Sequence, residues 1–202
     1  MTRIKMCGLR RACDIEAANE LRPDYVGFVF ANGSKRYVSP EEAKVLRSML
    51  DPGISAVGVF VDADPSFIED ILDSGTIDMI QLHGNEDGGY IDRLRSSSSA
   101  PIVKAFRIGD GMDVDEIMSC PADHIMLDSG AGTGNVFDWN MIENMNRPYF
   151  LAGGLSADNV EEAIERLHPF AVDVSSGIET DGFKDKTKMA AFVAAVRRGD
   201  RQ

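Results

Sequence analysis

RIKMCGLRRACDIEAANELRPDYVGFVF, residues 3–30, contains the unit that decides the fold. A short apolar run at 3–8 is followed by a longer stretch of helical pattern and then by a second apolar run at 25–30. Short strands that alternate with helices are typical of βα units, whose strands pair in parallel. The stretch therefore predicts a strand, a helix and a second strand parallel to the first.

The same alternation continues along the rest of the sequence. Strands are predicted at 3–8, 25–30, 55–62, 78–84, 101–108, 124–129, 149–154 and 171–176, each followed by a helical pattern. Ser39-Pro40-Glu41-Glu42 marks one helix start with an N-cap, a proline and a capping-box glutamate, and Asp64-Pro65 marks another. The serine run at 96–99 is expected to be a surface loop, because a strand pattern follows it at once.

Eight such units predict a single α/β domain over residues 1–202, folded as a (β/α)8 TIM barrel. The alternative is a doubly wound open sheet. That arrangement would leave the regular count of eight units unexplained. We therefore expect the closed barrel.

The composition narrows the classes of function. The net charge of −12, without a basic cluster, argues against a nucleic-acid partner. No run approaches the roughly 18 apolar residues of a membrane helix, and the N-terminus is too charged for a signal peptide, so we expect a cytoplasmic protein without a membrane partner. Cys7, Cys13 and Cys120 lack the paired spacing of a zinc or disulfide framework, so no metal site is expected.

The ends of the predicted strands select two candidate catalytic residues. Active sites of (β/α)8 barrels lie at the carboxyl ends of the strands, where Cys7 ends the first strand and Asp128 the sixth. A thiol and a carboxyl can act as general base and general acid if Asp128 keeps its proton in an apolar setting and Cys7 gains thiolate character, which Lys5 could encourage. From position alone, a packing role for Cys7 and a capping role for Asp128 remain open.

Two glycine-marked strand ends indicate a phosphate site. Gly153 and Gly154 follow the seventh strand, and Ser175-Ser176-Gly177 follows the eighth. In barrels these two loops commonly bind phosphate through backbone N–H groups, although glycine can also serve turn geometry alone. The glycine-rich stretch 130–134 is expected to be a mobile loop that could fold over a ligand.

Two further side chains are candidates for substrate binding. Arg36, in the loop after the second strand, is suited to clamping a planar carboxylate, although exposed arginines are usually solvated. His83 ends the fourth strand beside Gln81 and is expected to line the pocket. His124 and His168 are expected to have ordinary surface roles.

Taken together, these motifs resemble the phosphoribosylanthranilate isomerase family of tryptophan biosynthesis along nearly the whole chain. The matching segments occur in the same order as in that family, at 5–8, 27–30, 34–38, 57–61, 81–84, 127–134, 137–139, 151–155, 159–160 and 172–177. Three features depart from the family pattern: Ala131 stands where glycine is common, the gap before that loop is short, and Arg10 stands where threonine or asparagine is frequent. These departures concern loop closure and rate.

The resemblance implies a small phosphorylated substrate, no cofactor, and an Amadori rearrangement of N-(5-phosphoribosyl)anthranilate. It implies that Asp128 is the general acid and Cys7 the general base, that Arg36 binds the anthranilate carboxylate and that Asp173 lies near the ribose hydroxyls. The phosphate would lie on Gly153, Gly154, Ser175, Ser176 and Gly177.

Three alternatives remain open at this stage. Indoleglycerol-phosphate synthase would need more lysine and glutamate at the strand ends than this chain offers. The histidine-pathway isomerase resembles a paired-aspartate design, whereas the first strand here ends in Cys7. A catalytically dead barrel used for ligand sensing is the third, and the presence of both Cys7 and Asp128 argues against it. The sequence does not decide between a monomer and a homodimer.

Overall fold

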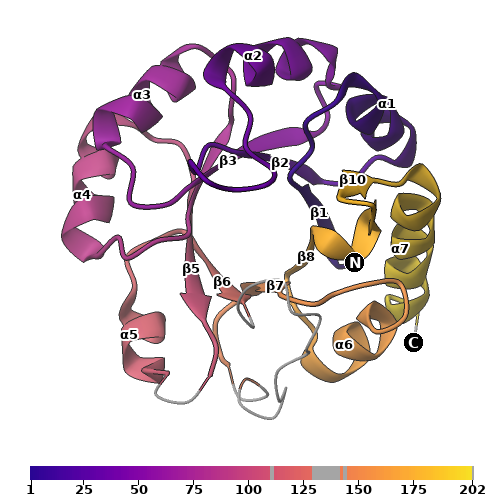
Figure 1. Ribbon diagram of the computed structural model, residues 1–202. Coiled ribbons are helices and arrows are strands. Elements are labelled where there is room, and N and C mark those ends of the chain that lie inside the picture. Colours follow the sequence, from indigo (N-terminus) through magenta and orange to yellow (C-terminus); the bar gives the residue numbers. More distant parts are fainter. Residues whose placement is uncertain (110–111, 129–141, 143–144, 202) are drawn as a thin grey trace.

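The computed structural model describes residues 1–109, 112–128, 142 and 145–201. Eight parallel strands close into a barrel in chain order, and β1 completes it by pairing with β8 (Figure 1). The barrel strands are β1 (Arg3–Cys7), β2 (Tyr25–Val29), β3 (Ser55–Phe60), β4 (Met79–Leu82), β5 (Ile102–Arg107), β6 (His124–Asp128), β7 (Tyr149–Ala152) and β8 (Ala171–Val174). The predicted barrel and all eight predicted strands are therefore confirmed, with strand ends shorter by one to a few residues.

Helices form a ring outside the barrel (Figure 1). They are α1 (Ala12–Leu21), α2 (Pro40–Met49), α3 (Pro65–Asp73), α4 (Gly88–Ser97), α5 (Val114–Ser119), α6 (Val160–Leu167) and α7 (Lys186–Gly199). The predicted capping box is present, since Ser39 Oγ accepts from the Glu42 N–H at 3.2 Å and Glu42 accepts from the Ser39 N–H at 2.8 Å. The helix predicted after the sixth strand lies outside the described residues. None of the helices in the described part is long and apolar enough to span a membrane.

The serine run 96–99 only partly forms the loop that was predicted. Ser96 and Ser97 are the last residues of α4, and Ser98 is its C-cap. Their hydroxyls donate to the carbonyls of Arg93 and Leu94, three residues earlier in the helix. Such bonds to earlier carbonyls are typical of serine within a helix, where the hydroxyl competes with the backbone donors.

The strands separate two apolar layers. Along β1, Ile4 and Met6 face the helices, whereas Lys5 and Cys7 face the lumen. The lower lumen is apolar and is filled mainly by Tyr25, Val57, Met79, Val103, Met126 and Phe150. Because side chains alternate along a strand, the next lumen layer toward the carboxyl ends holds the polar residues Lys5, Gln81 and Asp173. The polar layer of the lumen thus rests on an apolar one.

A small hairpin between β8 and α7 was not predicted. After a 3₁₀ turn (Ser176–Ile178), β9 (Glu179–Thr180) pairs with β10 (Phe183–Lys184) through a tight turn at Asp181-Gly182. Asp181 and Gly182 both have positive φ, as a two-residue hairpin of this kind requires. The Arg10 guanidinium lies 4.6 Å from the Phe183 ring centroid and donates to the Gly182 carbonyl at 3.2 Å, so this departure from the family pattern secures the hairpin.

A buried ion pair fastens the loops that follow β3 and β4. Lys104 Nζ on β5 lies 2.9 Å from Glu86 Oε2 and 2.6 Å from the Gly84 carbonyl. Glu86 also accepts from the backbone N–H groups of Asp62 and Gly84, at 2.8 and 2.9 Å. Both charged side chains are almost inaccessible to solvent, Lys104 at 7% exposure and Glu86 at 1%. Each charge is therefore compensated mainly by the other, because water cannot solvate it.

Replacing Lys104 by methionine is therefore expected to lower the free energy of unfolding by about 3–5 kcal/mol, because Glu86 would be left as an unpaired buried charge. Urea unfolding of the parent and the variant measures the difference. Adding Glu86→Gln to Lys104→Met should restore part of the loss, since it removes the unpaired charge. A single variant as stable as the parent would contradict the expectation.

Candidate functional site

A cavity of about 210 Å³ opens at the carboxyl ends of the strands. This is the end at which TIM barrels hold their active sites. Most of the predicted site residues line it: Cys7, Arg36, His83, Asp128, Gly153, Gly154, Asp173, Ser175 and Ser176. Gly177 was predicted to bind phosphate but is not among the lining residues.

Cys7 lies at the end of β1 above a buried ion pair. Lys5 Nζ donates to Asp173 Oδ1 at 2.8 Å, and the two residues are register partners on β1 and β8. The Lys5 ammonium also interacts electrostatically with Cys7. Burial lowers the pKa of Lys5, but the Asp173 carboxylate and Cys7 more than offset this, so Lys5 remains a firmly charged neighbour of the thiol.

Lys5 was expected to give Cys7 thiolate character, and the net effect is the opposite. Burial raises the pKa of the Cys7 thiol, and the nearby Asp173 carboxylate raises it further. The ammonium groups of Lys5 and Lys184 lower it, but by less. The reason is that a thiolate loses most of its hydration in this cavity, and the two ammonium groups do not fully replace that hydration. Cys7 is therefore a thiol at neutral pH.

Asp128, at the end of β6, is part of a chain of three polar side chains. Its Oδ2 lies 3.0 Å from His83 Nε2, and His83 Nδ1 lies 2.9 Å from Gln81 Nε2. The sequence indicated that Asp128 would need an apolar setting to act as an acid, whereas its side chain is 18% exposed and hydrogen-bonded to the His83 imidazole. His83 lines the cavity as predicted, and its contact with Asp128 gives it a role that its position in the sequence did not indicate.

Arg36 already clamps a carboxylate that belongs to the protein itself. Its Nε and Nη2 donate to the two carboxyl oxygens of Glu179 at 2.7 and 2.9 Å. Lys184 Nζ lies 2.7 Å from Glu179 Oε1 and also donates to the Ser175 carbonyl at 2.9 Å. Although burial acts to raise it, the hydrogen bonds from Arg36 and Lys184 lower the pKa of Glu179 to about 2.

In this arrangement Glu179 already occupies part of the Arg36 fork that was predicted to bind a substrate carboxylate. Two of the five guanidinium N–H donors hold Glu179, and a ligand would have to use the others. Sequence reasoning missed Glu179 and Lys184, which both lie in the unpredicted hairpin. The Asp181-Gly182 pair was the signal that could have revealed it.

The two glycine-marked loops pack against each other at the cavity edge. Gly153 and Gly154 have φ values of +90° and +65°, a backbone conformation that glycine adopts without strain. Asn159 fixes their loop, since its Nδ2 donates to the Gly154 carbonyl at 3.0 Å. Gly177 touches the Leu155 backbone so closely that a Cβ at this position would clash with the Leu155 carbonyl. Gly177 thus allows the two loops to meet.

Several predicted features fall outside the described residues. They are the glycine-rich loop 130–134, with Ala131 and the shortened gap before it, and the family segment 137–139.

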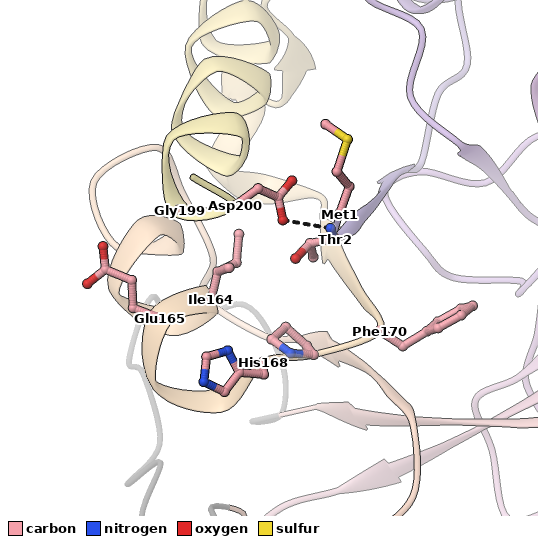
Figure 2. Close-up of a pocket in the computed structure, with 9 residues that line it drawn as sticks. Met1, Thr2, Ile164, Glu165, His168, Phe170, Gly199 and Asp200 are labelled. Atoms are coloured by element: carbon pink, nitrogen blue, oxygen red, sulfur yellow. Dashed lines mark hydrogen bonds between the residues drawn. The ribbon is translucent and has the colours of Figure 1, made fainter. Parts of the chain in front are cut away.

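A second, larger cavity of about 630 Å³ lies at the other end of the barrel. Figure 2 shows it between the N-terminus, α6 and the end of α7, with Asp200 hydrogen-bonded to the Thr2 backbone at 2.7 Å. His168 lines this cavity, and His124 stacks on Phe170 with ring centroids 5.1 Å apart, so both histidines lie away from the first cavity. Because barrel chemistry occurs at the carboxyl ends of strands, the smaller cavity is the candidate active site.

Comparison with known proteins gives one family. Residues 4–195 match the family model described as N-(5'phosphoribosyl)anthranilate (PRA) isomerase. A protein of that name from Clostridium acetobutylicum is 44% identical over 207 residues, covering 98% of this chain and 99% of its own length. The crystal structure of phosphoribosyl anthranilate isomerase from Thermotoga maritima superposes with a TM-score of 0.89 at 34% identity, over 98% of this chain and 99% of that one.

A further solved structure is of the isomerase in complex with reduced 1-(o-carboxyphenylamino)-1-deoxyribulose 5-phosphate. It is similar to this chain with a TM-score of 0.87 and 34% identity, covering 98% of this chain and 99% of that one. The bound molecule named there is the reduced form of a ketose phosphate that bears a carboxyphenylamino group.

Proposed function

The chain belongs to the N-(5'-phosphoribosyl)anthranilate isomerase family and acts as an isomerase in tryptophan biosynthesis, and we propose that Cys7 and Asp128 perform the chemistry. The main support is that the thiol at the end of β1 and the carboxyl at the end of β6 line one cavity beside two glycine loops. A base and an acid on separate walls can act on one sugar held between them.

The reaction proceeds by proton transfers alone and requires no external oxidant. Asp128 gives its proton to the furanose ring oxygen while the C1–O bond breaks, which leaves an iminium ion at C1. Cys7, as the thiolate, then removes the C2 proton, and the C–H electron pair forms a C1=C2 bond in an enolamine. The enolamine then tautomerises: C1 gains a proton and the C2 hydroxyl loses one, which gives the ketone at C2, so substrate and product are isomers.

The remaining cavity residues suit the two ends of this substrate. We place the phosphate at Gly153, Gly154, Ser175 and Ser176, where backbone N–H groups are natural anion donors, with Gly177 supporting that loop. Asp173 would lie near the ribose hydroxyls, held by Lys5. The donors of Arg36 that Glu179 does not use would face the anthranilate carboxylate.

The proposal also covers the molecule as a whole. Residues 1–202 would form one catalytic domain that works in the cytoplasm on a small phosphorylated substrate, without a nucleic-acid or membrane partner. It would act as a monomer or as a homodimer. Light scattering of the purified protein distinguishes the two.

The test follows the loss of phosphoribosylanthranilate fluorescence with the purified parent protein. The initial rate of fluorescence loss should be proportional to protein concentration, and the product should have the same mass as the substrate. A parallel assay with the aminoaldose substrate of the histidine pathway asks whether that compound is also converted. A parent protein that binds the reduced product analogue but converts neither substrate would favour a sensing role and overturn the proposal.

A further inference from the structure

Gln81, His83 and Asp128 form a hydrogen-bonded chain of side chains from β4 to β6. We propose that Gln81 fixes the tautomer of His83, so that His83 donates its Nε2–H to Asp128 Oδ2. The inference rests on the proposed function, because it assumes that Asp128 is the acid. Gln81 and His83 would then be positioning residues for this acid.

The Gln81 amide group is oriented by its nitrogen. Gln81 is 1% exposed, and its Nε2 lies 2.9 Å from His83 Nδ1 and 3.4 Å from Met126 Sδ. Both amide hydrogens therefore point to acceptors. Among the described residues, Gln81 Oε1 is buried and has no hydrogen-bond partner. The carbonyl thus does not determine the orientation.

Turning the amide by half a rotation would be less favourable. Oε1 would then replace the donor that faces the Met126 sulfur, and the NH₂ group would take the place of Oε1, where the described residues offer no acceptor. One orphaned acceptor would become two orphaned donors. The geometry therefore favours an amide N–H that points at His83 Nδ1.

This orientation determines where the imidazole proton lies. An N–H donor that faces Nδ1 requires a lone pair on Nδ1, so a neutral His83 carries its proton on Nε2. A proton on Nδ1 would set two donors against each other. The neutral imidazole therefore donates its Nε2–H toward Asp128 Oδ2, 3.0 Å away.

The consequence for catalysis concerns both states of Asp128. While the acid is protonated, its carboxyl already accepts from His83 Nε2. After the proton has moved to the substrate, the same Nε2–H stabilises the new carboxylate without any rearrangement. A donor fixed in advance at the place where charge develops is an effective form of catalytic assistance.

Nitrogen NMR on protein with ¹⁵N-labelled histidine tests the tautomer directly. The chain has three histidines, so comparison with a His83→Asn spectrum identifies the His83 signals. In the parent at neutral pH we expect a protonated Nε2 and an unprotonated Nδ1. In Gln81→Glu, the carboxylate should draw a proton onto Nδ1. A parent proton on Nδ1, or a spectrum unchanged by Gln81→Glu, would overturn the inference.

Kinetics give an independent readout. Gln81→Met keeps the length of the side chain but removes the donor, and we expect kcat to fall at least about tenfold with little change in KM, because the loss occurs after binding. Val45→Met, which places a methionine on the exposed surface of α2, is the control and should keep the parent kcat. An unchanged kcat in Gln81→Met would contradict the inference. Because the NMR experiment needs no substrate, an inactive parent would refute the proposed function without deciding the tautomer.

Discussion

Cys7→Ala is expected to lower kcat by about 10²–10⁴-fold, the usual contribution of a positioned general base. Cys7 holds the lumen position at the end of β1, near the Lys5 ammonium. The variant retains Asp128 and the glycine loops, so the reduced product analogue should still bind with a Kd close to that of the parent. The measurement combines the initial rate of fluorescence loss with a titration of the analogue.

Two further variants make this prediction specific to the thiol. Cys7→Ser nearly preserves the shape but offers a hydroxyl, a far weaker acid than a thiol, so it should be almost as slow as Cys7→Ala. Cys13→Ala removes the exposed cysteine of α1 and should keep the activity of the parent. Full activity in Cys7→Ala would show that another group removes the C2 proton.

The pH dependence of the parent follows from the same residue. Burial raises the pKa of the Cys7 thiol, so the fraction present as thiolate increases as the pH rises through the neutral and mildly alkaline range. Because the thiolate is the base, the rate with a substrate analogue whose ribose chain is already open, which does not need the Asp128 proton, is expected to rise with pH over that range, and the residual rate of Cys7→Ala should lack this rise. A parent profile with that analogue that is flat or falls above neutrality would contradict the assignment.

The barrel could be predicted because its information is local. Each βα unit is indicated by an apolar run, a helix cap and a short loop. Eight such units in a row are compatible with few sheet topologies. Alternation along a strand also placed Lys5 and Cys7 together in the lumen. Cys7 and Asp128 could be selected for the same reason, since strand ends and barrel geometry together indicate which side chains reach the cavity.

The partners of the site residues could not be predicted, because they join segments that are far apart in the chain. Arg36 meets Glu179 across 143 positions, and His83 meets Asp128 across 45. Nothing in either local sequence identifies the other partner. The net effect on the Cys7 thiol was also beyond sequence reasoning, because it depends on how completely the cavity removes water from the sulfur.

Asp128→Asn is expected to lower kcat by about 10²–10⁴-fold, because the carboxamide has nearly the same shape but no proton acidic enough for the ring oxygen. The amide oxygen can still accept from His83 Nε2, 3.0 Å from the carboxyl in the parent, so the cavity should keep its form. The affinity for the reduced product analogue should therefore change little, and the loss should be in kcat.

The matched control for this variant is Asp73→Asn, which makes the same chemical change at an exposed position at the end of α3 and should keep the parent rate. If Asp128 acts as the acid and not as a binding group, a substrate analogue with an already open ribose chain should regain much of the lost rate in Asp128→Asn, since ring opening no longer needs a proton donor. Equal loss with the open and the closed sugar would assign Asp128 to a later step. Full activity with the closed sugar would remove it from the mechanism.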